Sequence, residues 1–76
     1  MKNENFLGRI SSNPDILHGK PCIKGTRIPV YLIVSLVAED IKWNEIIKDY
    51  PSLTEEDISA ALFYASRIAN HEAYAI

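Results

Sequence analysis

The segment from Gly19 to Val30 constrains the fold of this chain more than any other. It places two glycines and two prolines, Gly19, Pro21, Gly25 and Pro29, between short apolar or β-branched pieces. Because glycine favours turns and proline cannot donate a backbone hydrogen bond, no regular helix can run through this segment. A long apolar run follows it directly. We therefore expect a basic β-hairpin that leads into a helix.

The hairpin is predicted over about residues 9–28. Arg9-Ile10-Ser11 is typical of a short strand, and two further pieces, Cys22-Ile23 and Thr26-Arg27-Ile28, are expected to pair with it. Residues 1–8 are expected to form a flexible N-terminal arm.

Three helices are predicted after the hairpin, over about residues 30–40, 43–50 and 54–74. The first is apolar around most of its circumference. Such a helix is either central to the core or shared with another subunit. The second carries its large apolar side chains at helical spacing on one side and ends before Pro51, because the residue preceding a proline disfavours helical dihedral angles.

The third helix has the clearest start signal in the chain. Thr54 is the expected N-cap, and Asp57 lies three residues later, where its carboxylate can return the hydrogen bond in a capping box. Glu55 and Glu56 also fall in the first turn, where the helix dipole favours negative charge. An inward face is expected to continue through Ile58, Ala61, Leu62, Ala65, Ile68 and Ala69.

Together these elements predict a mainly α fold with a small N-terminal β-hairpin. The helices form a trihelical, homeodomain-like or winged helix-turn-helix, and residues 9–76 are expected to be one domain. A chain of 76 residues is near the lower limit for a single hydrophobic core. We expect a homodimer, because self-association would bury apolar surface that so small a body leaves uncovered.

Composition indicates the cellular compartment in which we expect the protein. Cys22 is the only cysteine, which excludes an intrachain disulfide and favours a reducing compartment. The first eight residues lack the apolar centre of a signal peptide, and no run approaches the roughly 20 apolar residues that cross a bilayer. We expect a cytoplasmic protein without membrane contact.

Charge is unevenly distributed along the chain. Five cations and two acids precede Val30, whereas three cations and eight acids follow from Val30 onward. This polarity indicates two kinds of partner or a charged self-interface, and it argues against a uniformly basic DNA coat protein.

Four cations of the basic part are candidate DNA contacts: Arg9, Lys20, Lys24 and Arg27. Arg27 suits a base edge or a bidentate phosphate contact best. Alternatively, the lysines are solvated and Arg27 pairs with a carboxylate of a neighbouring helix. The acids that open the third helix would repel phosphates at the end where recognition helices approach the bases. Either the hairpin and arm dominate the DNA contact, or the helices bind protein instead.

A second candidate surface is an aromatic and basic stripe at helical spacing on the third helix: Tyr64, Arg67, His71 and Tyr74. We consider it as a docking surface for a partner protein. The alternative is an ordinary solvent-facing side with the tyrosines at the edge of the core.

No catalytic constellation emerges from the sequence. Ser11, Asp15 and His18 could be written as a hydrolytic triad, but nothing in the sequence brings them together. His18 and Cys22, even with His71, are too few and too loosely spaced for a structural zinc site. We therefore predict no enzyme activity, no cofactor, no metal and no small-molecule substrate.

The sequence resembles the prokaryotic domain-of-unknown-function family 433. The resemblance covers roughly residues 9–65 and rests on two blocks. The first contains Ile10, Pro14 and the segment from Gly19-Lys20-Pro21 to Val30, and the second runs from Glu45-Ile46 through Asp49-Tyr50-Pro51 to Tyr64-Ala65. It implies a homeodomain-like helix-turn-helix. Since members are often encoded beside a PIN-like ribonuclease toxin, it also implies an antitoxin that binds operator DNA, represses its own operon and neutralises the toxin. The alternative is a module that binds a partner protein without binding DNA.

Three positions depart from the pattern of that family. Asp40 stands where glycine usually ends the first helix, Lys42 where a small hydroxyl residue usually caps the second, and His18 where a small residue usually precedes Gly19. Aspartate tolerates a left-handed backbone less well than glycine. Either the corner at Asp40 is strained, or the first helix is longer than in the family.

Overall fold

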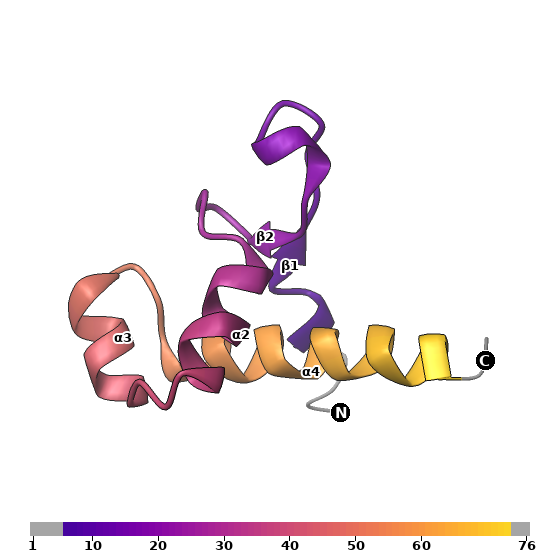
Figure 1. Ribbon diagram of the computed structural model, residues 1–76. Coiled ribbons are helices and arrows are strands. Elements are labelled where there is room, and N and C mark those ends of the chain that lie inside the picture. Colours follow the sequence, from indigo (N-terminus) through magenta and orange to yellow (C-terminus); the bar gives the residue numbers. More distant parts are fainter. Residues whose placement is uncertain (1–5, 74–76) are drawn as a thin grey trace.

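The computed structural model describes the backbone of residues 6–73 and the side chains of residues 6–70. Its elements follow in the order β1 (Ile10–Ser11), a 3₁₀ turn η1 (Leu17–Gly19), β2 (Cys22–Ile23), α2 (Val30–Ala38), α3 (Trp43–Asp49) and α4 (Glu55–Ala73). The long helix α4 runs beneath the other elements, with α2 packed against it and α3 at its N-terminal end (Figure 1). The predicted mainly helical fold with a small antiparallel hairpin is confirmed.

The hairpin is a two-stranded antiparallel sheet, in which Ile10 pairs with Ile23 and Ser11 with Cys22. The predicted third strand, Thr26–Ile28, is wrong, because this segment forms a turn. The hydroxyl of Thr26 donates a hydrogen bond to the carbonyl oxygen of Ile23 over 2.7 Å and accepts one from the amide of Ile28 over 3.0 Å. After the turn the chain returns along β2 and not along β1, since Pro29 forms a single antiparallel bridge with Cys22.

The loop between the two strands contains a left-handed turn. Leu17, His18 and Gly19 have φ angles of 52°, 58° and 83°. A side chain in this conformation crowds its own backbone, which costs roughly 1–2 kcal/mol per residue outside glycine. His18, which stands where the pattern of the domain-of-unknown-function family 433 usually has a small residue, therefore falls at a position where a side chain strains the backbone.

The C-terminal end of α2 is a Schellman motif. The amide of Ile41 donates a hydrogen bond to the carbonyl oxygen of Leu36 over 3.0 Å. The amide of Asp40 donates one to the carbonyl oxygen of Val37 over 2.9 Å. Asp40 has a φ of 68°, which glycine adopts without strain. Of the two alternatives for Asp40, a strained corner or a longer first helix, the structure shows the strained corner, since α2 ends at Ala38.

The predicted capping box of α4 is confirmed. The hydroxyl of Thr54 accepts a hydrogen bond from the amide of Asp57 over 3.2 Å, and the carboxylate of Asp57 accepts one from the amide of Thr54 over 3.0 Å. Asp57 is buried, unlike Glu55 and Glu56 in the same turn. The start of α4 is therefore fixed by one exposed side chain, Thr54, and one buried side chain, Asp57.

The core lies where the first half of α4 meets α2, α3 and β2. Its buried side chains are Ile23, Val30, Ile33, Ile46, Leu53, Ile58 and Ala61. The inward face predicted for α4 is right for Ile58 and Ala61. It is wrong for Ile68, which is 43% exposed, and for the exposed Ala69, because α4 runs past the elements that could cover it (Figure 1).

The N-terminal segment begins, within the described residues, against α4. The rings of Phe6 and Phe63 lie 5.9 Å apart between centroids, and the carbonyl oxygen of Phe6 accepts a hydrogen bond from the amide of Arg9 over 3.0 Å. The rest of the predicted arm, residues 1–5, lies outside the described part. None of the helices described has both the length and the apolar character that a membrane crossing requires.

Candidate binding surfaces

The structure separates the four candidate DNA contacts into three places, and Arg9 stands apart from the others. Its guanidinium donates to the carboxylate of Asp57 over 3.0 Å, with 41% of the Arg9 side chain exposed and 8% of that of Asp57. This ion pair ties the hairpin to the first turn of α4. Contact of Arg9 with DNA stays a prediction, and within the fold its guanidinium is paired with a buried carboxylate.

Lys24 and Arg27 lie together at an open hollow of about 670 Å³ between the loop after β1 and the turn after β2. We call this the basic hollow. Its lining residues are Ser11, Ser12, Asn13, Pro14, Ile16, Lys24, Gly25, Thr26 and Arg27. No carboxylate lines it, so the two cations dominate its charge.

The groups at the basic hollow suit an anion. Lys24 and Arg27 are both exposed, and neither forms an ion pair with any side chain of residues 6–70. The alternative in which Arg27 pairs with a helix carboxylate is therefore not found in this part of the chain. The hydroxyls of Ser11 and Ser12 add hydrogen-bond donors beside the cations. Cations and hydroxyls are the side-chain groups that contact phosphate oxygens in protein–DNA complexes.

Sequence reasoning missed the polar half of this hollow. Ser12 and Asn13 line it from the opposite side of the hairpin, and the turn that presents Gly25 is closed by hydrogen bonds of Thr26. The available signal was the run of small polar residues directly after β1, Ser12-Asn13. Its position opposite Lys24 depends on the strand register and could be found only from the structure.

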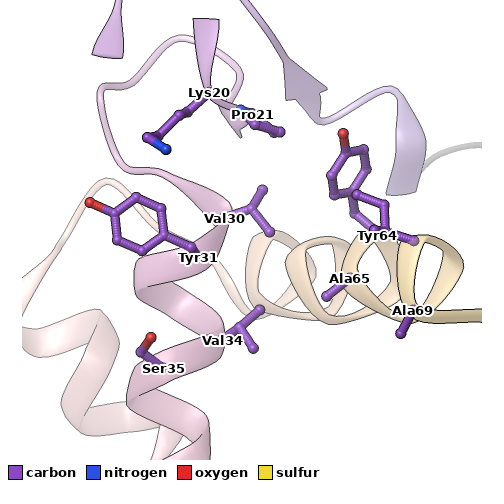
Figure 2. Close-up of a pocket in the computed structure, with 10 residues that line it drawn as sticks. Lys20, Pro21, Val30, Tyr31, Val34, Ser35, Tyr64, Ala65 and Ala69 are labelled. Carbon is purple, nitrogen blue, oxygen red and sulfur yellow. The ribbon is translucent and has the colours of Figure 1, made fainter. Parts of the chain in front are cut away.

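Lys20 belongs to a different surface. Its ammonium group lies 5.8 Å from the centre of the Tyr31 ring, a cation–π arrangement at the N-terminal end of α2. Lys20 and Pro21 close one end of an apolar groove of about 440 Å³ between α2 and the C-terminal half of α4 (Figure 2). The remaining lining residues are Val30, Tyr31, Val34, Ser35, Tyr64, Ala65, Ile68 and Ala69. We call this the α2–α4 groove.

The predicted aromatic and basic stripe is divided in the structure. Tyr64 lines the α2–α4 groove, and its ring points toward Pro21 (Figure 2). Arg67 does not line the groove, because its guanidinium lies 5.7 Å from the centre of the Phe63 ring. The side chain of His71, and Tyr74 altogether, lie outside the described residues. Tyr64 and Arg67 are therefore associated with different neighbours.

Comparison with known proteins places this architecture in a family. The sequence pattern of the family described as "Protein of unknown function (DUF433)" matches residues 10–65. The uncharacterized protein y4eO of Sinorhizobium fredii is 41% identical over 56 residues, which make up 74% of this chain and 25% of that protein. The chain thus spans about a quarter of the length of this curated relative.

A solved structure agrees in fold. The crystal structure of a DUF433 member protein from Anabaena variabilis superposes with a TM-score of 0.77 at 31% sequence identity. The match covers 90% of this chain and 67% of that protein. The family pattern, the relative and the shared fold all lead to one assignment: this chain belongs to the DUF433 family of proteins of unknown function.

Proposed function

We propose that this protein is a non-catalytic antitoxin of the cytoplasm, which binds operator DNA to repress its own operon and neutralises a PIN-like ribonuclease. The observation that carries the DNA-binding part is the basic hollow. There Lys24 and Arg27 are exposed and without a carboxylate partner among the described side chains. The antitoxin part follows from the family resemblance and from the polar distribution of charge, which suits two kinds of partner.

The basic hollow is suited to the phosphate backbone of DNA. Cations and hydroxyls that contact phosphates fix the position and orientation of a protein on the duplex. Lys24 supplies a compact charge, whereas Arg27 supplies a planar fork of donors that fits two phosphate oxygens. The Arg9–Asp57 ion pair supports this role indirectly, because it holds the hairpin on α4 and so fixes the hollow relative to the helices.

The test is DNA binding by paired charge reversals. In fluorescence anisotropy with a labelled duplex from the region upstream of the gene, Lys24→Glu combined with Arg27→Glu should weaken binding at least about tenfold, since two phosphate contacts become repulsive. The matched control reverses two lysines away from the hollow, Lys42→Glu with Lys48→Glu, and should bind within about threefold of the wild type. Unchanged binding by the first variant at low salt would refute the DNA contact at the hollow.

The antitoxin part is tested with the protein encoded by the adjacent gene. We expect a PIN-like ribonuclease, whose arrest of growth is relieved when this protein is co-expressed. Arg67, which is exposed above Phe63, is the candidate cation for docking to an acidic nuclease site. Arg67→Glu should weaken capture of the nuclease in a pull-down, with Lys48→Glu as the matched control. Normal capture by Arg67→Glu would exclude Arg67 as a docking residue.

A specific observation favours a second candidate, a protein-binding module that does not bind DNA. Glu55 and Glu56 are exposed in the first turn of α4, the helix in the recognition position of a helix-turn-helix. Their charge opposes phosphates where such helices normally approach the bases. A wild-type protein that captures its partner but shows no salt-sensitive binding to the upstream duplex would decide for this candidate.

A further inference from the structure

The apolar face of α4 extends beyond the core. Ile58 and Ala61 are fully buried, while Ala65 and Ile68, which continue the same face at spacings of four and three residues, are half-buried and 43% exposed. Figure 1 shows the C-terminal turns of α4 running past α2 and the hairpin. A helix half without tertiary packing is marginal in water, because most helical stability in proteins comes from packing of the apolar face. This part of α4 therefore lacks a covering surface within the described chain.

Helix α2 adds a second uncovered face on the other side of the α2–α4 groove. Tyr31 is 59% exposed, and Ser35, one turn later, is also exposed. Both line the groove together with Ala65 and Ala69 of α4 (Figure 2). The small side chains of Ser35, Ala65 and Ala69 let another helix approach closely. The larger side chains of Tyr31 and Ile68 are exposed and can act as knobs. One face thus carries both holes and knobs, which is what a surface that pairs with a copy of itself requires.

The charges along the exposed face of α2 are opposite at its two ends. Lys20 lies over Tyr31 at the N-terminal end, and Glu39 is exposed at the C-terminal end. Tyr31, Ser35 and Glu39 follow at intervals of four residues, so they share one side of the helix. The helix rises about 12 Å over these eight residues, which keeps both charges within one contact surface. No carboxylate lines the groove itself.

We infer that the α2–α4 groove is covered by a second copy of this chain, in a symmetric dimer whose α2 helices run antiparallel. The two-fold axis passes near Ser35, each Lys20 then lies close to Glu39 of the other copy, and the exposed end of α4 packs over the partner. Charge complementarity is the reason to choose a second copy. Antiparallel pairing brings opposite charges together at both ends, whereas parallel pairing would place like charges together.

The dimer is tested by measuring molar mass over a concentration series, by light scattering and sedimentation velocity, without DNA or any partner. The wild type should be dimeric at micromolar concentration. Ser35→Arg should be monomeric, because it places two guanidinium groups at the two-fold axis. Ser66→Arg is the matched control, since Ser66 is exposed on α4 and does not line the groove, and it should remain dimeric. Circular dichroism of each variant at low concentration checks that the helices are intact.

A charge swap tests the antiparallel arrangement itself. Lys20→Glu and Glu39→Lys should each raise the dimer Kd about 3- to 30-fold, since each change affects two symmetric ion pairs. Lys20→Glu combined with Glu39→Lys should restore the Kd to within about threefold of the wild type, whereas the control Lys48→Glu should leave it unchanged.

Two results would overturn the inference. The wild-type chain could stay monomeric up to about 1 mM, the weak end of specific association. That result would mean that the groove is not covered by a second copy and binds a protein of different sequence instead. If the Ser35→Arg variant remained dimeric, the dimer interface would have to lie on another face of the molecule. The inference does not depend on the proposed function, because the mass measurement contains no DNA and a monomer could still bind DNA through the basic hollow.

Discussion

Asp40 holds a backbone conformation that its own side chain opposes. Its φ of 68° is required by the Schellman motif that ends α2. Asp40→Gly should therefore stabilise the protein by about 0.5–1 kcal/mol, which corresponds to a rise in Tm of roughly 2–8 °C for a domain of this size. Thermal unfolding followed by circular dichroism measures the change.

The matched control at this site is Asp40→Ala. It removes the same carboxylate but keeps a Cβ atom in the left-handed conformation, so it should stabilise nothing and lower Tm slightly. Equal gains from glycine and alanine would mean that charge, rather than backbone strain, limits this corner.

Asp57 joins two functions in one buried carboxylate, since it caps α4 and holds Arg9. Asp57→Ala should cost about 2 kcal/mol, roughly 1 from the lost cap and roughly 1 from the lost ion pair. Arg9→Ala should cost only about 1 kcal/mol, because the remaining carboxylate keeps its hydrogen bond from Thr54. The two single variants and the double variant, compared by urea unfolding, should show a coupling energy of about 1 kcal/mol. Strict additivity of the two costs would show that the ion pair contributes nothing.

At the scale of an element, the N-terminus of α3 is left without a side-chain cap. Lys42 is the N-cap residue and makes no capping hydrogen bond. Lys42→Ser should therefore stabilise the protein by about 0.5–1 kcal/mol, because a serine hydroxyl can accept from an amide of the first turn. Lys48→Ser, at an exposed position inside α3, should cost about 0.3–0.5 kcal/mol through helix propensity. A loss of stability in both variants would exclude the capping argument.

The elements that were predicted correctly depend on interactions close in the sequence. The capping box needs only Thr54 and Asp57, three residues apart. Helix α3 ends at Asp49 because Tyr50, the residue before Pro51, disfavours helical dihedral angles. The third strand was wrong because the Thr26 side chain closes a turn that competes with strand pairing. Helical periodicity predicted the apolar face of α4 but not the point near Ala65 where the core stops covering it.

At the scale of the whole molecule, the candidate sites depend on contacts that sequence spacing cannot give. Arg9 meets Asp57 across 48 positions, and this pairing sets it apart from the other candidate DNA contacts. Lys20 and Lys24 are close in sequence, yet one lies over Tyr31 and the other at the basic hollow. The sequence indicated a basic hairpin. The structure places its lysines at two different surfaces: strand register positions Lys24 at the basic hollow, and the packing of α2 on α4 forms the α2–α4 groove beside Lys20.

The two candidate surfaces lie at separate places on the molecule. The basic hollow is formed by the two loops of the hairpin, and the α2–α4 groove by the helices. The groove and the basic hollow share no lining residue, so closing the groove in the inferred dimer does not require covering the basic hollow. Such an arrangement would present two equivalent phosphate contacts, as symmetric DNA-binding dimers do on operators with two half-sites.

We propose above all that the basic hollow contacts nucleic-acid phosphates. The most direct test of this claim is the dependence of the DNA-binding constant on salt concentration, for the wild type and for Lys24→Glu combined with Arg27→Glu. Each phosphate contact releases counterions, so the wild-type constant should fall steeply with salt, and the variant should lose about 2 from the log–log slope for each bound chain. Equal slopes for the two proteins, or a wild-type constant independent of salt, would contradict the claim.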